Sequence, residues 1–491
     1  MKFWRAPYRA IQYHLYLLQL ENYELSRFWQ ALSGKGVLPP RAPFRKRLII
    51  TPKLAAVGIL GIILQAGFAA LVAVIFAGWQ GWGSAAAEIF FIVVFTLLSW
   101  EYAIFATGAV GLIIPWDRFI KFIIVNQARR RLARVKPPII VGIAGSYGKT
   151  TMKEVIGTVL KGTRQVLVTP ENINTPLGIA RLINRRLSAN TEVLVAEMGE
   201  YYRGDIAEIC KLTPPTVAVI TGINEAHRER LRSAAAAAET IFEAVEQSTP
   251  DALVVLNADD ELVRQATPRW VKDRRVVWYS AYHHPLAAYQ VGEWRFDPAA
   301  LTQHFTLQKE GEAPLSFTTK LLGRYVIGNA MAGLIIAEQL GLPRSIVPAA
   351  LAALPPLPHR LEPRYNAAMD IVVIDDTYNG NPAGAREAFN LLQEFSGRRK
   401  LIITPGLVEM GSETERVHSQ LGEAMARAAD EVLLIKNSVT PFLAEGLRRA
   451  GHLATNIHWF NSAPEAHAAI VPFLKRGDVI LFQNDWPDNY A

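Results

Sequence analysis

The chain has 491 residues, of which 50% are hydrophobic, and it carries a formal net charge of +8 at pH 7. This length accommodates two or three domains, and its positive mean hydropathy is high for a purely soluble protein. The single cysteine, Cys210, excludes an intramolecular disulfide and a cysteine zinc cluster, and it fits a reducing compartment.

Residues 1–48 carry the pattern of an amphipathic helix. Apolar residues that recur at helical spacing give a helix one hydrophobic face, which suits a membrane surface or a partner. Because of the segments that follow, we expect this helix on the cytoplasmic side of a membrane. The residues on its apolar face are Ile11, Leu15, Leu18, Leu25, Phe28 and Leu32.

Two apolar stretches within residues 49–116 predict two transmembrane helices. The stretches 54–76 and 89–114 each exceed the roughly 20 residues that cross a hydrocarbon core of about 30 Å. A long polar and aromatic segment precedes the first stretch, which argues against a cleaved signal peptide. Glu101 lies within the second stretch, and two interpretations stay open. It is a functional carboxylate in the membrane, or it marks a break between short helices that dip into the membrane.

Basic residues flank the two apolar stretches. They occur between 41 and 53 and again in 117–137, a predicted basic juxtamembrane linker, whereas the connection 77–87 has none. The positive-inside rule therefore places both termini and the rest of the chain in the cytoplasm, on a multi-pass protein of the cell membrane. We expect membrane lipid as a partner and no nucleic acid, since no nucleic-acid-binding motif accompanies these residues.

From residue 138 onward the pattern predicts an α/β fold in two domains. Short apolar runs alternate with helical patterns, which is typical of a largely parallel sheet. The central domain, 138–353, includes a β-rich insertion at 274–322 and then a helix at 329–340. A proline-rich linker at 354–358 opens a smaller, Rossmann-like α/β domain, 354–491. The predicted strands are 139–144, 166–169, 193–197, 216–221, 252–257, 371–374, 400–404, 431–435 and 479–482.

A glycine loop, GSYGKTT, joins the first predicted strand to a helical segment. This arrangement directs backbone N–H groups and a helix N-terminus at an anion. Lys149 would reach the β- and γ-phosphates of a nucleotide, and the hydroxyl of Thr150 would reach Mg²⁺. The loop is shorter than a Walker A motif, whose first glycine is Ile143 here. The central domain is therefore predicted to be a P-loop-type ATPase domain. The predicted phosphate-binding residues are Gly145, Ser146, Gly148, Lys149, Thr150 and Thr151.

Glu197 and His227 follow two other strands of the same predicted sheet. An open α/β sheet places its ligands at the carboxyl ends of its strands, so both side chains are expected near the loop. With the hydroxyl of Thr150 they would suit Mg²⁺ beside a triphosphate. Taken singly, Glu197 is equally well explained as a helix cap and His227 as a surface residue.

The sequence IDDTYNGNP follows the first parallel strand of the last domain. Its carboxylates and amides suit a turn and a helix N-cap, but there are more of them than a cap needs, which favours ligand contact. Arg360 lies just after the linker, where closure of the two domains would bring its guanidinium onto phosphate.

A series of motifs resembles, in order and spacing, those of the Mur ligase family: GSYGKTT, ENINTPLG, VAEMG, TGINEAH, NADD, HRLE, DDTYNGNP and VEMGSETERVH. The resemblance covers about residues 138–491 and is nearest to the members that add D-alanyl-D-alanine. It implies an ATP-dependent amide ligase that uses ATP and Mg²⁺. In that family ATP phosphorylates a substrate carboxylate, and an amine attacks the acyl phosphate to release phosphate.

The resemblance also implies roles for individual residues of this chain. Asn329 is expected to contact adenine, Arg360 the phosphates and Asp376 the ribose. The implied metal ligands are Thr150, Glu197 and His227. The implied catalytic residues are Lys149, His227 and Arg360. The residues implied to contact substrate are Asn174, Thr175, Tyr378, Asn379 and Asn381.

The chain departs from the family pattern in its N-terminal part and in its second metal site. The family's N-terminal domain, which binds UDP, is replaced by the membrane segment. The family also has a lysine, usually carbamylated, that helps to hold a second Mg²⁺, but no lysine occurs between Lys211 and Lys272. Glu239 or Glu243 would offer a carboxylate in its place.

Two shorter motifs differ as well. The family's adenine-side His-Asn pair is Tyr325-Val326 here, and its C-terminal Lys-Gly-Ser is Gln483-Asn484-Asp485. The second change bears on the choice of amine.

The leading hypothesis is a membrane-anchored ligase that joins an amino acid or dipeptide to a carboxylate acceptor. The acceptor is expected to be a cell-wall (peptidoglycan) precursor, either soluble or attached to lipid. Two alternatives remain: a ligase for another amide polymer, and a catalytically degenerate ATP-binding scaffold of wall synthesis. The missing lysine favours the scaffold, whereas the intact phosphate loop favours an active ligase.

Overall fold

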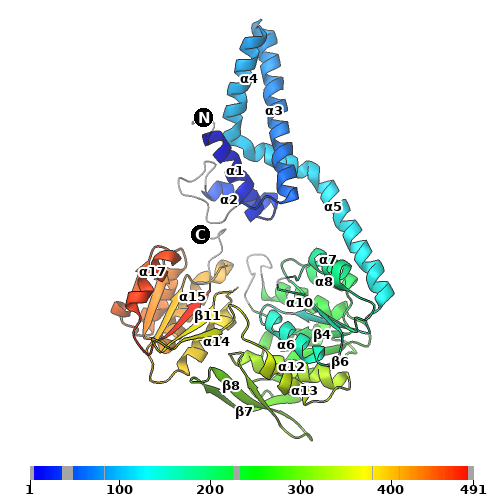
Figure 1. Ribbon diagram of the computed structural model, residues 1–491, viewed down its shortest axis with the longest axis vertical. Coiled ribbons are helices and arrows are strands. Elements are labelled where there is room, and N and C mark those ends of the chain that lie inside the picture. Colours follow the sequence, from blue (N-terminus) through cyan, green and yellow to red (C-terminus); the bar gives the residue numbers. More distant parts are fainter. Residues whose placement is uncertain are drawn as a thin grey trace. The chain divides into compact units, whose positions relative to one another are not determined.

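The computed structural model describes residues 5–35, 48–81, 83–171, 173–224, 233–378, 380–408 and 410–484 (Figure 1). The chain forms two compact units, whose boundary in the sequence falls between Ile123 and Ile124. The first unit is helical and the second is α/β, and each is described by itself.

The N-terminal segment forms two helices, so the prediction of a single amphipathic helix over residues 1–48 is wrong. Helices α1 (Arg5–Leu20) and α2 (Leu25–Lys35) are separated by a turn in which Asn22 and Tyr23 have φ angles of 53° and 64°. Asparagine visits this left-handed conformation more readily than most residues, which favours a turn at this point. Both helices pack on the helices that follow, in a cluster that includes Leu17, Leu18, Phe28, Leu32, Val57, Tyr102 and Ala106.

The second apolar stretch is interrupted, although a single helix was expected over 89–114. It begins as α4 (Ser84–Leu98), passes through a 3₁₀ turn, η1 (Ser99–Glu101), and continues as α5 (Tyr102–Val135). The turn lies where one interpretation of Glu101 places a break, and the side chain of Glu101 is exposed.

Polar contacts hold this turn against α3 (Pro52–Gln80). Gln65 of α3 donates to the carbonyl of Phe95 at 2.7 Å and to the hydroxyl of Ser99 at 3.0 Å. The hydroxyl of Tyr102 donates to the carbonyl of Gly58 at 2.9 Å. Polar groups buried among apolar side chains are costly unless they are paired, so these bonds favour a break at this point.

Two helical segments of the described chain are long and apolar enough to cross a membrane: Pro52–Gln80 and Ala85–Val135. Large apolar side chains on α3 remain exposed, among them Ile59 (62%), Leu71 (57%) and Val74 (69%).

The second unit begins with the end of α5, so the part of the expected linker 117–137 that follows residue 123 is helical and packed. Ala128 is wholly buried against the central domain. The guanidinium of Arg131 donates to the carbonyl of Asn184 at 2.6 Å and twice to that of Leu187, at 2.9 and 2.6 Å. These carbonyls close helix α7 (Pro176–Arg186). Arg131 therefore satisfies the C-terminus of a helix, where a cation is favoured.

The central domain is built on a nine-stranded sheet in the order β2-β3-β1-β4-β5-β6-β7-β8-β9. The first seven strands in this order, from β2 through β1 to β7, run parallel to one another. Strands β8 and β9 then extend the sheet in antiparallel fashion. The β-rich insertion thus continues the main sheet. The strands are β1 (Ile139–Ala144), β2 (Val166–Val168), β3 (Val193–Glu197), β4 (Val217–Ile220), β5 (Leu253–Asn257), β6 (Arg275–Ser280), β7 (Tyr289–Asp297), β8 (Thr302–Lys309) and β9 (Leu315–Thr319).

Helices cover both faces of this sheet (Figure 1). One face packs on α6 (Lys149–Lys161), α12 (Tyr325–Gln339) and α13 (Ile346–Ala353). The other packs on the end of α5, on α7, and on α8 (Asp205–Leu212), α10 (Ala234–Glu246) and α11 (Glu261–Trp270). Because the sheet is buried on both sides, its parallel strands are continuous apolar runs rather than alternating ones.

The C-terminal domain has a six-stranded sheet in the order β10-β11-β15-β12-β13-β14, in which β10 is antiparallel to its neighbour. Helices α14 (Pro382–Gln393), α15 (Thr414–Ala428) and α16 (Thr440–Arg449) pack on one face and α17 (Ala463–Phe473) on the other. The strands are β10 (Glu362–Asn366), β11 (Ile371–Asp376), β12 (Lys400–Thr404), β13 (Glu431–Ile435), β14 (Ile457–Phe460) and β15 (Val479–Gln483). Both predicted α/β domains are therefore confirmed.

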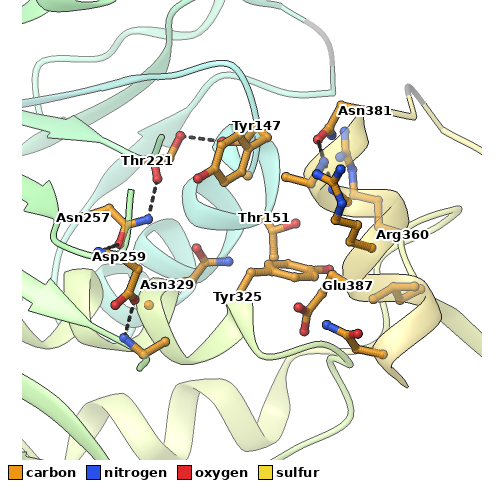
Figure 2. A pocket seen from close by; sticks show the side chains of 18 of the residues that line it. Tyr147, Thr151, Thr221, Asn257, Asp259, Tyr325, Asn329, Arg360, Asn381 and Glu387 are labelled. Atoms are coloured by element: carbon orange, nitrogen blue, oxygen red, sulfur yellow. Dashed lines mark hydrogen bonds between the residues drawn. The ribbon is translucent and has the colours of Figure 1, made fainter. Parts of the chain in front are cut away.

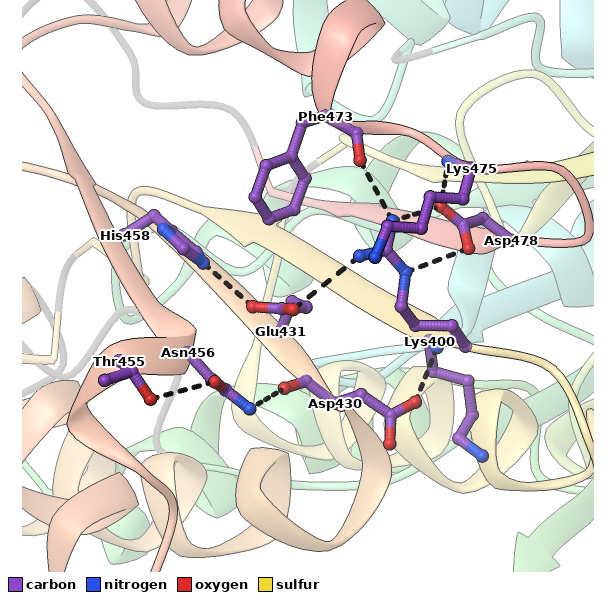
Figure 3. A network of polar contacts seen from close by, with 10 residues as sticks. Lys400, Asp430, Glu431, Thr455, Asn456, His458, Phe473, Lys475 and Asp478 are labelled. Atoms are coloured by element: carbon purple, nitrogen blue, oxygen red, sulfur yellow. Dashed lines mark hydrogen bonds and ion pairs between the residues drawn. The ribbon is translucent and has the colours of Figure 1, made fainter.

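A charged network joins the amino ends of the C-terminal strands (Figure 3). Arg399 binds both carboxylate oxygens of Asp478, at 3.0 and 2.6 Å, and lies 3.6 Å from Glu431. Glu431 in turn lies 2.8 Å from the imidazole Nε2 of His458. Ligands of such a sheet bind at the opposite, carboxyl edge, so this network serves the fold.

Candidate functional site

The phosphate loop joins β1 to α6 and needs glycine at two positions. Gly145 and Gly148 have φ angles of 142° and 77°, which other residues rarely adopt. A side chain at Gly145 would also collide with Thr221 and Gly222, which lie against the loop. Among the described residues, no side chain caps helix α6, so its first N–H groups point at the place where an anion would bind.

The loop lysine and threonine each meet a carboxylate from the end of β3. The ammonium of Lys149 donates to the carbonyl of Gly145 and, at 2.8 Å, to Glu200. The hydroxyl of Thr150 donates to Glu197 at 3.0 Å. The hydroxyl of Thr150 and the carboxylate of Glu197, both predicted as metal ligands, therefore lie in contact.

Two residues that were not predicted complete this group. Lys153, one turn after Lys149 on α6, is wholly buried; it donates to Glu197 at 3.1 Å and to the carbonyl of Glu171 at 2.7 Å. Glu200 follows Glu197 by three residues and is 3% exposed. The spacing of Lys153 on the helix signals a shared face with Lys149, but only the fold shows which carboxylate each lysine meets.

The donor set fits Mg²⁺ at Thr150 and Glu197, because a hydroxyl and a carboxylate are the oxygen ligands this ion prefers. In the structure both bonds from Thr150 and Lys153 reach the same oxygen, Oε2 of Glu197. His227 lies outside the described residues, so the structure does not place this predicted ligand.

A pocket of about 430 Å³ adjoins the loop and is lined by both α/β domains (Figure 2). Its size is in the usual range for a small-molecule site. The lining is rich in tyrosines and amides. The lining includes Tyr147, Tyr282, Tyr325, Asn329, Arg360 and Asp376.

Asn329 fits the expected contact with adenine. It is 3% exposed, it lines the pocket, and its side-chain Nδ2 has no hydrogen-bond partner among the described residues. A buried amide without a partner is costly, so a ligand that accepts a hydrogen bond here would remove that cost. Tyr325 lies beside it in Figure 2, and its ring is a flat surface for a base.

Arg360 and Asp376 enter the pocket from the C-terminal domain. Arg360 is flanked by His359 and Leu361, whose φ angles are 59° and 49°. The guanidinium of Arg360 lies 4.7 Å from the ring centre of Tyr378. Burial raises the pKa of Asp376 to about 7, although the N–H of Leu361 and the charge of Arg360 lower it.

The two domains also touch directly beside the pocket. Asn224 donates to Asn381 at 3.0 Å, and Asn381 also accepts from the N–H groups of Ala383 and Gly384, so it caps α14. Glu387 of α14 accepts from the backbone N–H of Arg324. These contacts hold the pocket walls together across the two sheets.

Other motif residues make contacts that hold the surrounding loops and helices in place. Asp260 accepts from the hydroxyl of Tyr147 at 2.7 Å and from the N–H of Ile223 at 2.9 Å, which ties the loop to the sheet. The backbone carbonyl of Asn174 accepts from Gly199 at 2.9 Å, and Thr175 caps α7. Asn379 lies outside the described residues.

The carboxylates expected to replace the missing lysine have other partners. Glu239 pairs with Arg203. Glu243 accepts from the N–H groups of Gly204 and Ala207 at 2.8 and 2.9 Å, and so it caps α8. Burial raises the pKa of Glu243, against the effect of these two bonds.

The raised pKa of Asp376 predicts a pH-dependent stability. A carboxyl whose folded pKa lies above its ordinary value stabilises the fold at low pH, and this contribution is lost as the pH rises from about 4 through about 7. Asp376→Asn should therefore raise the Tm of the full chain at pH 8 by about 2–4 °C, since the group is partly exposed to solvent.

Thermal unfolding at pH 5 and pH 8 checks this expectation. The matched control is Asp370→Asn, because Arg398 lowers the pKa of Asp370 and its removal should bring no gain at pH 8. An equal Tm for wild type and Asp376→Asn at pH 8 would contradict the prediction.

Comparison with known families identifies both α/β domains. The Mur ligase middle domain matches residues 143–337, and the domain described as "Mur ligase, glutamate ligase domain" matches residues 359–483. Residues before 143 lie outside both matches.

Curated relatives agree with this assignment. The chain is 29% identical over 353 residues to UDP-N-acetylmuramoyl-tripeptide–D-alanyl-D-alanine ligase of Escherichia coli, covering 67% of this chain and 74% of that protein. It is 25% identical over 346 residues to the enzyme of the same name from Bacillus subtilis, covering 70% and 72%.

Solved structures agree as well. The MurF ligase of Thermotoga maritima in complex with ADP superposes with a TM-score of 0.65 at 25% identity, covering 74% of this chain and 80% of that one. MurF from Acinetobacter baumannii gives a TM-score of 0.67 at 20% identity, covering 75% and 78%, which shows a shared fold. The resemblance inferred from the motifs is thus confirmed: this chain belongs to the Mur ligase family.

Proposed function

We propose that this protein is a membrane-anchored, ATP-dependent ligase that joins an amino acid or dipeptide to the carboxylate of a peptidoglycan precursor. The observation that carries the proposal is that the phosphate loop, Asn329, Arg360 and Asp376 meet around one pocket between two domains of a ligase family. Relatives named as D-alanyl-D-alanine ligases of a UDP-muramoyl tripeptide support the choice of substrates.

Each residue has a role that follows from its surroundings. Lys149 and the N-terminus of α6 would hold the phosphates, and Thr150 and Glu197 would hold Mg²⁺. Asn329 would bind the base, and Asp376 would accept hydrogen bonds from ribose. Arg360, held by Tyr378, would place positive charge on the phosphate that is transferred.

ATP would supply the phosphoryl group: the carboxylate oxygen forms the new P–O bond, the bond to ADP breaks, and ADP leaves. The resulting acyl phosphate carries phosphate, a better leaving group than oxide. The amine nitrogen then forms the C–N bond, the C–O bond to phosphate breaks, and the amine gives up a proton. The chain's own contribution is to orient these groups and to neutralise the developing negative charge.

The helical unit would anchor the enzyme. Its two apolar segments support insertion into the cell membrane, with both termini in the cytoplasm. An anchored enzyme meets acceptors that are attached to lipid, or soluble ones that are made close to the membrane.

Phosphate release by the purified full chain tests the proposal. With ATP and Mg²⁺, release should require both an acceptor and an amine. A UDP-linked muramoyl tripeptide and its lipid-linked form are the two acceptor arms, and D-alanyl-D-alanine and single amino acids are the amine arms. ADP binding without stimulated release in any arm would contradict ligase activity and favour a nucleotide-binding scaffold of wall synthesis.

A further inference from the structure

Two lysine–glutamate pairs stand side by side at the phosphate loop. Lys149 and Lys153 lie one turn apart on α6, Glu197 is the last residue of β3, and Glu200 follows it by three residues. Lys149 pairs with Glu200 at 2.8 Å and Lys153 with Glu197 at 3.1 Å. Each lysine of the loop region therefore already has a carboxylate as its counter-ion.

The two pairs differ in what else holds them. Lys153 is wholly buried and also donates to the carbonyl of Glu171, so its ammonium is fixed within the domain. The side chain of Lys149 is 12% exposed, and that of its partner Glu200 is 2% exposed. Lys149 can thus reach a ligand, whereas Glu200 stays largely shielded from water.

Phosphate groups that bind Lys149 must share this ammonium with Glu200. An ammonium has three N–H donors, and Lys149 already directs two of them at Gly145 and Glu200. If Lys149 keeps Glu200, the phosphates lie a few ångströms from a second negative charge. If Lys149 leaves Glu200, a buried carboxylate loses its cation. Both outcomes oppose the binding of a polyphosphate.

We propose that Glu200 is a positioning residue that holds Lys149 in the loop and sets the affinity of the site for nucleotide phosphates. It also makes that affinity depend on Mg²⁺, because a divalent cation offsets the repulsion between the carboxylate and the phosphates. This inference rests on the proposed role of Lys149 in phosphate binding.

The test is ADP binding to the full chain, measured by titration calorimetry in EDTA and again in Mg²⁺. In Glu200→Gln the amide oxygen can still accept from Lys149, but the negative charge is gone. In EDTA this variant should bind ADP at least about fivefold more tightly than wild type, and Mg²⁺ should enhance its binding less. Glu200→Ala also loses the acceptor, so its gain should be smaller than that of Glu200→Gln.

Controls separate this inference from the proposed function. Glu192→Gln removes a half-exposed carboxylate that pairs with Arg164, and it should bind ADP like wild type. Suppose that wild type binds ADP and Lys149→Ala does not. If the ADP affinity of Glu200→Gln then matches that of wild type within about twofold, both in EDTA and in Mg²⁺, the role of Glu200 is overturned while the proposed function stands. If wild type binds no ADP at all, both fail together.

Discussion

Replacement of Lys149 by alanine is expected to lower phosphate release by about a thousandfold or more, because the loop loses the cation that meets the phosphates. The ammonium lies beside Gly145 and Glu200, at the opening of α6. The measurement is phosphate release with the acceptor and amine that support wild-type turnover. Lys161→Ala, an exposed lysine at the end of the same helix, is the matched control and should keep full activity.

The unpaired carboxylate left by this change has its own effect, which a second variant removes. Lys149→Ala strands Glu200 without its cation, and a buried unpaired charge by itself disturbs a site. The double variant Lys149→Ala/Glu200→Gln relieves that charge. It should remain inactive if Lys149 acts on phosphate, whereas recovery of activity would show that the loss came from the stranded carboxylate.

Replacement of Lys153 by methionine is expected to destabilise the central domain by about 3 kcal/mol. The change keeps the volume of the side chain but removes the cation from buried Glu197, which retains the hydroxyl of Thr150, and removes the ammonium donor from the carbonyl of Glu171. The Tm of the full chain reports the loss, and exposed Lys161→Met should leave it unchanged.

The same variant tests whether Glu197 holds a cation. Without the ammonium of Lys153, a divalent ion is the remaining compensation for the carboxylate, so ADP with Mg²⁺ should raise the Tm of Lys153→Met more than that of wild type. An equal gain in both proteins would show that Mg²⁺ does not bind at Glu197.

Much of the fold follows from local patterns in the sequence. The predicted parallel strands of the central domain appear because each is a continuous apolar run between helices, which a sheet buried on both faces requires. The short edge strands β10 and β14 were not predicted. β10 consists largely of polar residues, so its pairing with β11 leaves little apolar pattern to detect.

The helical unit shows where local patterns are insufficient. By hydropathy alone, residues 89–114 form one continuous apolar stretch. The break at Ser99–Glu101 depends on Gln65 of another helix, which donates hydrogen bonds to the hydroxyl of Ser99 and the carbonyl of Phe95. Likewise, the amphipathic pattern of the first 48 residues does not reveal the turn at Asn22 and Tyr23.

Local sequence was enough to determine the strand, loop and helix around Lys149, because a glycine turn between an apolar run and a helix involves only neighbours in the chain. Tertiary structure alone decided the pairing of Lys149 with Glu200 and of Lys153 with Glu197. It also decided that Arg360 and Asp376 line the same pocket as Asn329. These contacts join segments far apart in the chain, and their partners are selected by burial, where every charge needs a counter-ion and every polar group a bond.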